Sequence, residues 1–104
     1  MKLAPALLAV LLLVVSPVSR ASSSSQRAHG EQVFNTSGCR QCHTIGNSGG
    51  ARGPNLSAIG KMLSKAAIRK QIVYGGKSMP PFGTILDKSD LDAVVAYLRS
   101  LRGN

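Results

Sequence analysis

The sequence predicts a small all-α fold of about three to five helices with long connections. Apolar residues recur at helical intervals in several segments, and no stretch alternates apolar and polar residues long enough to predict a strand. The 104 residues leave room for one domain at most. With two Phe, two Tyr and no Trp, the interior is thin, so we expect another buried body to complete the core.

The N-terminus has the pattern of a secretory signal peptide. Lys2 precedes an almost unbroken apolar run from Leu3 to Val15, and small residues around Ser19-Arg20-Ala21 suit a signal peptidase. The run is shorter than the roughly 20 residues of a membrane-spanning helix. We expect cleavage after Ala21 and no stable membrane insertion afterwards, with a retained anchor as the alternative.

The domain organisation follows from this signal. We assign residues 1–21 to the signal peptide, 22–27 to a disordered, serine-rich lead-in and 28–104 to one folded domain. An exported chain would act in the periplasm or an equivalent compartment outside the cytoplasmic membrane, such as the thylakoid lumen. Disulfide bonds are chemically permitted there.

The charge balance is strongly basic. The formal charge is +9, and loss of Lys2 and Arg20 with the signal leaves +7. Such a surface suits acidic partner proteins. The basic residues are spread from Arg27 to Arg102 rather than gathered into a run, so we expect no nucleic-acid partner.

Four helical segments are predicted. The first spans 27–36, with Val33 and Phe34 facing inward, and one or two turns follow within 56–63. A helix capped by Ser64 runs to Tyr74, where two glycines end it. The last begins at an N-cap, Ser89, and places leucines and valines on one face as far as residue 101.

Cys39, Cys42 and His43 form the strongest chemical motif. On a helical turn, residues three apart share a face, so both thiols can meet one flat object. The C-x-x-C-H spacing is a haem attachment signature, with the histidine as iron ligand. A disulfide is the main alternative; zinc would need further ligands, and no second cysteine pair exists. We favour haem, which would also complete the thin core.

A sixth iron ligand could come from three side chains. Met62 lies at helical spacing within 56–63, and we expect it in the core. His29 lies on the first helix, where we expect it to be exposed. Met79 precedes Pro80-Pro81, which hold the chain extended and let a soft thioether reach a buried metal, so we favour it over the alternative of a loop methionine capping the core.

The order of these features resembles a class I c-type cytochrome over nearly the whole mature chain, and a small bacterial monohaem one in particular. The matching segments are Gly30 to Phe34, Cys39 to His43, Gly53 to Leu56, Tyr74 to Gly76, Met79 to Phe82 and Leu91 to Leu101. The resemblance implies a cytochrome c fold over 28–104. The first and last helices would cross there, with Gly30 and Phe34 meeting Tyr97 and Leu98.

The resemblance also implies the site. One haem c per chain would be attached through Cys39 and Cys42, with His43 and Met79 as the two axial ligands. The carbonyl of Pro54 would accept the other ring N–H of His43. The Trp that helps to bind a propionate in larger relatives is missing, so Arg52 and Tyr74 are our candidates for that contact.

The function implied is electron transfer rather than catalysis. The chain would carry one electron between a reductase and a terminal oxidase or photosynthetic acceptor. Three alternatives remain: a haem-based ligand-binding or sensor module, a haem subunit of a larger respiratory complex, and a basic protein without cofactor that holds a disulfide or binds nucleic acid.

Overall fold

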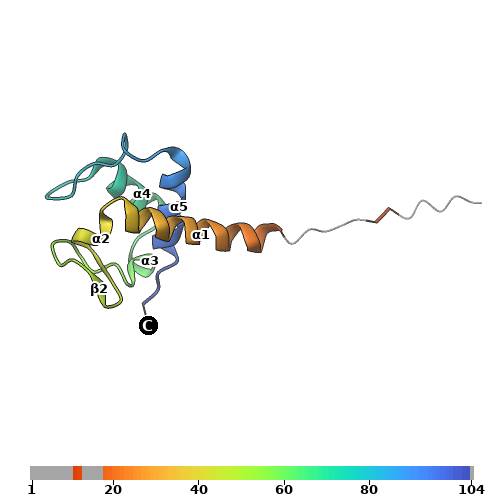
Figure 1. The fold of residues 1–104 in the computed structure, drawn as a ribbon, viewed down its shortest axis with the longest axis horizontal. Helices are drawn as coiled ribbons and strands as arrows, with labels where there is room; N and C mark the ends of the chain where they lie inside the picture. Colours follow the sequence, from red (N-terminus) through yellow and green to blue (C-terminus); the bar gives the residue numbers. More distant parts are fainter. Residues whose placement is uncertain (1–10, 13–17, 104) are drawn as a thin grey trace, which may run out of the picture.

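The computed structural model describes residues 11–12 and 18–103, with side chains from Ser23 onward. The signal-peptide prediction therefore lies largely outside the described residues. Within them, helices pack around one core beside a single short hairpin (Figure 1), which confirms the all-α prediction. The elements are α1 (Val18–Thr36), α2 (Cys39–Cys42), β1 (Thr44–Ile45), β2 (Ser48–Gly49), α3 (Ile59–Met62), α4 (Lys65–Tyr74) and α5 (Lys88–Arg99).

Helix α1 is longer than predicted. It begins at Val18, so residues 22–27, expected to be a disordered lead-in, are helical in the structure. No Gly or Pro interrupts this stretch, and Ser23 and Gln26 line a groove together with Ala96 and other residues of α5. The side chains from Ser23 to Ala28 are exposed, so this part of α1 is helical without being buried in the core. The helix ends at Thr36, as predicted.

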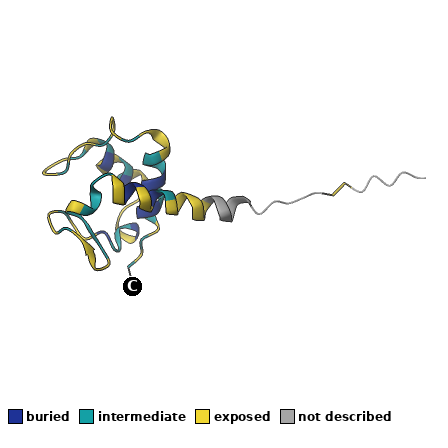
Figure 2. Ribbon diagram, in the orientation of Figure 1, coloured by how far each residue is buried: buried dark blue, intermediate teal, exposed yellow. Residues whose placement is uncertain are grey.

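The core lies where α1 crosses α5. The ring centroids of Phe34 and Tyr97 are 6.1 Å apart and the rings are tilted by 59°. Gly30 permits this approach, because a Cβ there would lie 2.0 Å from the carbonyl oxygen of Ala93. Figure 2 shows the buried residues concentrated at this crossing. The expected contacts of Gly30 and Phe34 with Tyr97 are therefore confirmed.

Helix α4 begins and ends as its sequence predicted. The hydroxyl oxygen of Ser64 accepts a hydrogen bond of 3.1 Å from the amide of Ala67, and Gly75 is the C-cap. Ile68 and Ile72 are buried against the core. Because these two residues are four positions apart, they lie on one face of the helix. This face packs against the core, so α4 is the third helix that encloses the core, after α1 and α5.

Helix α5 begins two residues earlier than expected. Its N-cap is Asp87, whose carboxylate accepts a 2.8 Å hydrogen bond from the amide of Asp90, so the prediction of Ser89 as the cap is wrong. Asp and Ser are comparably good caps, and the extended backbone of residue 87 decides between them. Ala93, Val94, Val95 and Leu98 are buried on the inner face.

Met62 is not a core residue, contrary to expectation. It is 73% exposed, because α3 is a single turn and the chain becomes extended at Leu63. The buried residue of this turn is Gly60, whose amide donates to the carbonyl oxygen of Leu101 at 2.8 Å. A one-turn helix can turn only one position inward, and here a glycine occupies it.

His29 is half-buried rather than exposed. Its Nε2 lies 2.7 Å from Oδ1 of Asp90, which ties α1 to the first turn of α5. In the part of the chain that the structure describes, no helix is both long and apolar enough to span a bilayer.

Candidate functional site

The two cysteines lie together on the single turn of α2. Gly38, with φ of 87°, turns the chain sharply between α1 and α2. Both side chains are half-buried, and no disulfide joins them. Among the described residues, no three His, Cys, Asp or Glu side chains gather around a common point that could hold a metal ion.

Burial controls the protonation of the first cysteine. Removal from water raises the pKa of the Cys39 thiol, and the nearby Cys42 raises this pKa further, while a backbone hydrogen bond acts in the opposite direction. Before haem is attached, the Cys39 thiol is therefore harder to deprotonate than an exposed cysteine.

His43 is held in one orientation by the loop that follows the hairpin. Its Nδ1 lies 2.8 Å from the carbonyl oxygen of Pro54. A carbonyl only accepts, so Nδ1 carries the proton and Nε2 keeps a free lone pair. This is the tautomer that a metal-ligating histidine needs, and the carbonyl increases the basicity of Nε2.

The same loop packs tightly beneath the imidazole ring. A Cβ at Gly53 would lie 2.5 Å from Cε1 of His43, so only glycine fits. The amide of Gly53 donates to the carbonyl oxygen of Cys42 at 2.7 Å, and that of Leu56 donates to Thr44 at 2.8 Å. Hydrogen bonds thus join both ends of this loop to the residues on either side of His43. The imidazole ring is fixed between these two connections.

Met79 lies in a second loop, after α4. Backbone hydrogen bonds of 3.0 Å run in both directions between Gly76 and Met79, and Phe82 is bonded to the carbonyl oxygen of Ile72 at 2.9 Å. The Met79 side chain is half-buried against the core, and Nε2 of Gln71 lies 3.7 Å from its sulfur atom. The loop is therefore fixed to α4 on both sides of Met79.

The two loops extend toward the same side of the molecule. In Figure 1, the hairpin after α2 and the segment after α4 both reach away from the N-terminal end of α1. Between residues 45 and 86, the part of the chain that contains both loops, several large apolar side chains are exposed or only partly buried. They are Met62, Leu63, Tyr74 and Ile85, with Ile45, Ile59, Phe82 and Leu86 partly buried.

This arrangement fits haem c. Two unpaired thiols on one helical turn suit thioether links, and an imidazole with a free Nε2 suits the iron. A soft thioether is available from a separate loop, and apolar side chains are present to cover a porphyrin.

Arg52 and Tyr74, the predicted propionate contacts, are both exposed, Tyr74 by 72%. Their role stays a prediction. Sequence reasoning missed Gln71, which the structure places beside Met79. Its position two turns before the methionine loop on α4 carries no signal of its own in a single sequence.

Comparisons with known proteins identify the family of the chain. The family model described as "Cytochrome C oxidase, cbb3-type, subunit III" matches residues 25–98. The chain is 37% identical to the cbb3-type cytochrome c oxidase subunit FixP of Azorhizobium caulinodans over 77% of its length and 31% of that protein. It is 34% identical to cytochrome c6 of Alaria esculenta, covering 67% of this chain and 85% of that one.

A solved structure gives the same result for the fold. The c-type cytochrome SorU from Sinorhizobium meliloti aligns with a TM-score of 0.66 and 25% identity, covering 77% of this chain and 94% of that one. The chain therefore belongs to the cbb3-type subunit III family of c-type cytochrome domains, and the prediction of a small class I c-type cytochrome is confirmed. Its cofactor is covalently bound haem c with its iron.

The relatives fall into two size classes. The chain spans 25% and 31% of two oxidase subunits that it matches, but 85% and 96% of two cytochromes c6. The shared part is thus the haem domain, which occurs both alone and inside larger subunits.

Proposed function

We propose that this chain is a monohaem electron carrier that acts outside the cytoplasmic membrane and catalyses no reaction of its own. The observation that carries the proposal is the fixed tautomer of His43, whose Nδ1 is bonded to Pro54 and whose Nε2 is left for a metal. When bound, haem supplies an iron that changes between the ferric and ferrous states by one electron.

The site residues have separate roles in this proposal. Cys39 and Cys42 would each hold haem through a thioether, in which the sulfur bonds to one vinyl carbon and the thiol hydrogen goes to the neighbouring carbon. His43 and Met79 would ligate the iron, one from each loop. A methionine opposite a histidine favours the reduced iron and raises the potential. With both axial positions filled, the site exchanges electrons and leaves no position for a substrate.

The residues around the proposed haem ligands also support electron transfer. Gly53 and Pro54 keep the imidazole ring rigid, so little reorganisation accompanies a change of oxidation state. Arg52 and Tyr74 are proposed to contact the propionates. The basic surface would attract acidic redox partners, such as a reductase and a terminal oxidase or photosynthetic acceptor.

Export is part of the proposal. The N-terminal apolar run with its small-residue cleavage pattern would direct the chain to the periplasm or an equivalent compartment. Haem attachment to free thiols and a basic carrier between membrane complexes are both consistent with that location.

A second candidate function is that of a haem subunit in a larger respiratory oxidase. The family description and the oxidase-subunit relatives favour it. Native material from the source organism distinguishes the two functions. Size-exclusion chromatography would give a single small haem protein for a carrier, whereas a subunit would elute with an oxidase.

The electron-carrier assignment is tested with carbon monoxide. We expect the visible spectrum of the reduced holoprotein to be unchanged by the gas, because Met79 occupies the sixth position. Rapid and stoichiometric formation of a carbon monoxide complex would instead identify a ligand-binding or sensor module. Extraction with acidified acetone gives the control for attachment: the colour should stay with the protein.

A further inference from the structure

A narrow groove lies between α1, α4 and α5, on residues that take no part in the haem site. Its volume is about 240 Å³. It is lined by Arg27, Lys65 and Arg99, together with Ser23, Gln26, Ala96 and Ser100. The three cations come from three different helices and are far apart in the sequence, so the fold alone brings them together.

The cations of this groove are not neutralised within the described residues. No acidic side chain lines the groove. The ion pairs that the described residues form are His29–Asp90, Arg69–Asp92 and Lys88–Asp92, and none of them involves a groove cation. Three like charges around one small space repel one another, and a bound anion would relieve that repulsion.

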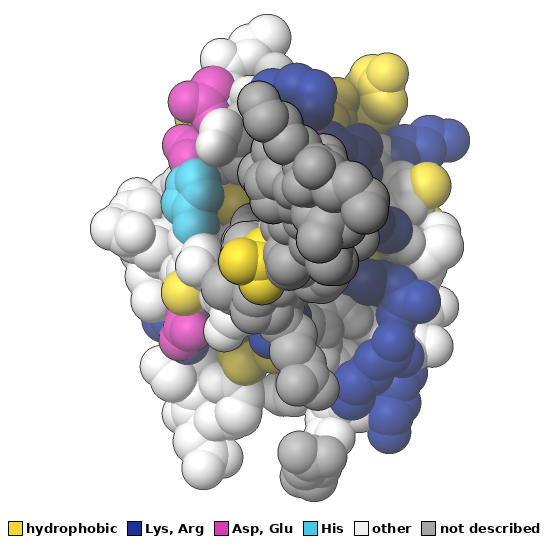
Figure 3. All heavy atoms as spheres, turned by 90° about the vertical axis from the view of Figure 1, so that its right-hand side faces the viewer, with side chains coloured by type: hydrophobic (Ala, Val, Ile, Leu, Met, Phe, Trp, Pro, Cys, Tyr) yellow, Lys and Arg dark blue, Asp and Glu magenta, His cyan; other side chains and the backbone are white. Residues whose placement is uncertain are grey.

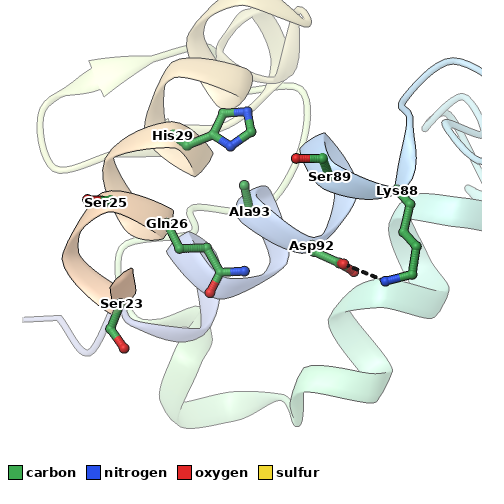
Figure 4. Close-up of a pocket in the computed structure, with 8 residues that line it drawn as sticks. All are labelled: Ser23, Ser25, Gln26, His29, Lys88, Ser89, Asp92 and Ala93. Carbon is green, nitrogen blue, oxygen red and sulfur yellow. Dashed lines mark hydrogen bonds and ion pairs between the residues drawn. The ribbon is translucent and has the colours of Figure 1, made fainter. Parts of the chain in front are cut away.

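In a larger depression beside the groove, by contrast, the positive charges are paired with acidic side chains. It measures about 820 Å³ and lies between α1 and the first turns of α5 (Figure 4). Its cation, Lys88, forms a 2.8 Å ion pair with Asp92, and its His29 is paired with Asp90. The charges there are already paired, so of these two hollows the smaller groove is the one that offers unused positive charge.

The backbone adds to the positive field of the groove. Lys65 is the first residue of α4, a helix of 10 residues, and the positive end of its dipole is at this end. Arg99 is positioned by a hydrogen bond from its Nη1 to the carbonyl oxygen of Gly60, which uses one of its five N–H donors. Gln26 supplies a side-chain amide, whereas the Ser100 hydroxyl already donates to the carbonyl oxygen of Tyr97.

The charges of this end of the molecule are segregated. Figure 3, viewed along α1, shows Lys and Arg side chains along one side and the acidic and histidine side chains along the other. This face of the molecule thus carries a one-sided basic surface rather than an even mixture of charges.

We propose that the groove binds a phosphate-class oxyanion. Guanidinium, ammonium and amide groups around one space are the donor set that recognises such a group, and the volume suits one or two phosphates. The phosphate could be free or belong to a phospholipid headgroup.

The proposal is tested on the holoprotein by amide NMR with sodium pyrophosphate, at ionic strength held constant with chloride. We expect saturable shifts confined to the first turns of α1, the first turn of α4 and the end of α5. Arg27→Gln and Lys65→Gln should each weaken binding about tenfold, the loss expected for one charge-assisted hydrogen bond. Lys70→Gln removes the same charge from α4 outside the groove and should change affinity less than about twofold.

Two results would overturn the proposal. One is a set of shifts that spreads over all Lys and Arg residues without saturating; the other is equal weakening by Lys65→Gln and Lys70→Gln. Vesicles of phosphatidylglycerol and phosphatidylcholine identify the source. Sedimentation of the protein with the vesicles that is reversed by pyrophosphate would assign a headgroup, and pyrophosphate binding without sedimentation would assign a free phosphate compound. The visible spectrum checks that every variant has kept its haem.

Discussion

Nδ1 of His43 lies 2.8 Å from the carbonyl oxygen of Pro54, and the glycine before that proline lies directly against the imidazole ring. This contact joins two segments that the sequence separates by a hairpin. It fixes both the orientation and the tautomer of the histidine. The properties of the iron site should therefore depend on residues that never touch the iron.

Gly53→Ala tests this dependence. The new Cβ would lie 2.5 Å from the His43 ring, so the ring must move and its bond to Pro54 must weaken. We expect a changed visible spectrum and a shifted reduction potential. Gly46→Ala is the control: its φ of 63° makes alanine unfavourable, yet no atom lies within 4 Å of the new Cβ. It should lose about 1 kcal/mol of stability without any spectral change.

Gly30→Ala tests the helix crossing. The added methyl group would meet the carbonyl oxygen of Ala93 at 2.0 Å and force α1 away from α5. We expect a loss of about 1 to 3 kcal/mol or more in the free energy of unfolding, measured by urea titration of the holoprotein. Gln32→Ala, at an exposed position of the same helix, should lie within about 0.5 kcal/mol of the parent. Equal stabilities of the two variants would contradict the crossing.

Asp92 gives a prediction for pH. Hydrogen bonds from Lys88 and then from Arg69 hold the pKa of the Asp92 carboxyl below its usual range. A lowered folded-state pKa contributes stability above the unfolded-state pKa, and this is lost as pH falls through the folded-state value. Asp92→Asn should therefore be less stable than the parent at pH 7, with the gap closing below about pH 4.

The comparison for Asp92→Asn is Glu31→Gln, which removes an exposed carboxylate. Its unfolding midpoint should follow the parent at every pH. A gap for Asp92→Asn that stays constant from pH 7 to pH 2 would show that the side chain acts by packing and not through its charge.

Lys77 is the one non-glycine residue with positive φ in the described part of the chain, at 56°. It lies in the loop that carries Met79. Lys77→Gly should relieve about 1 kcal/mol of backbone strain, partly offset by the greater freedom of glycine when unfolded. Ser78→Gly gains no such relief and should be destabilising. Thermal unfolding of both variants would test this prediction. A change in melting temperature of the same sign in both variants would argue against strain at Lys77.

Much of this architecture could be predicted from local sequence signals. Ser64 and Gly75 delimit α4 because caps act within a few residues of a helix end. The cysteine motif and the two prolines after Met79 are local too. The order of these signals was enough to identify the family.

The failures have different causes. Residues 22–27 continue α1 with side chains that are exposed from Ser23 onward, so no apolar periodicity predicts them, and His29 is half-buried because Asp90 approaches from a distant segment. Met62 is exposed because α3 ends after one turn. The strands β1 and β2 have two residues each, too few for any alternating pattern.

The central claim, that Met79 and His43 are the two axial ligands, is tested most directly by the visible spectra of Met79→Ala and Met62→Ala beside the parent, oxidised and reduced. Met62 is exposed and serves as the matched methionine control. We predict that Met79→Ala alone changes the spectrum and that its reduced form binds carbon monoxide. A spectrum of Met79→Ala identical to that of the parent would contradict the account.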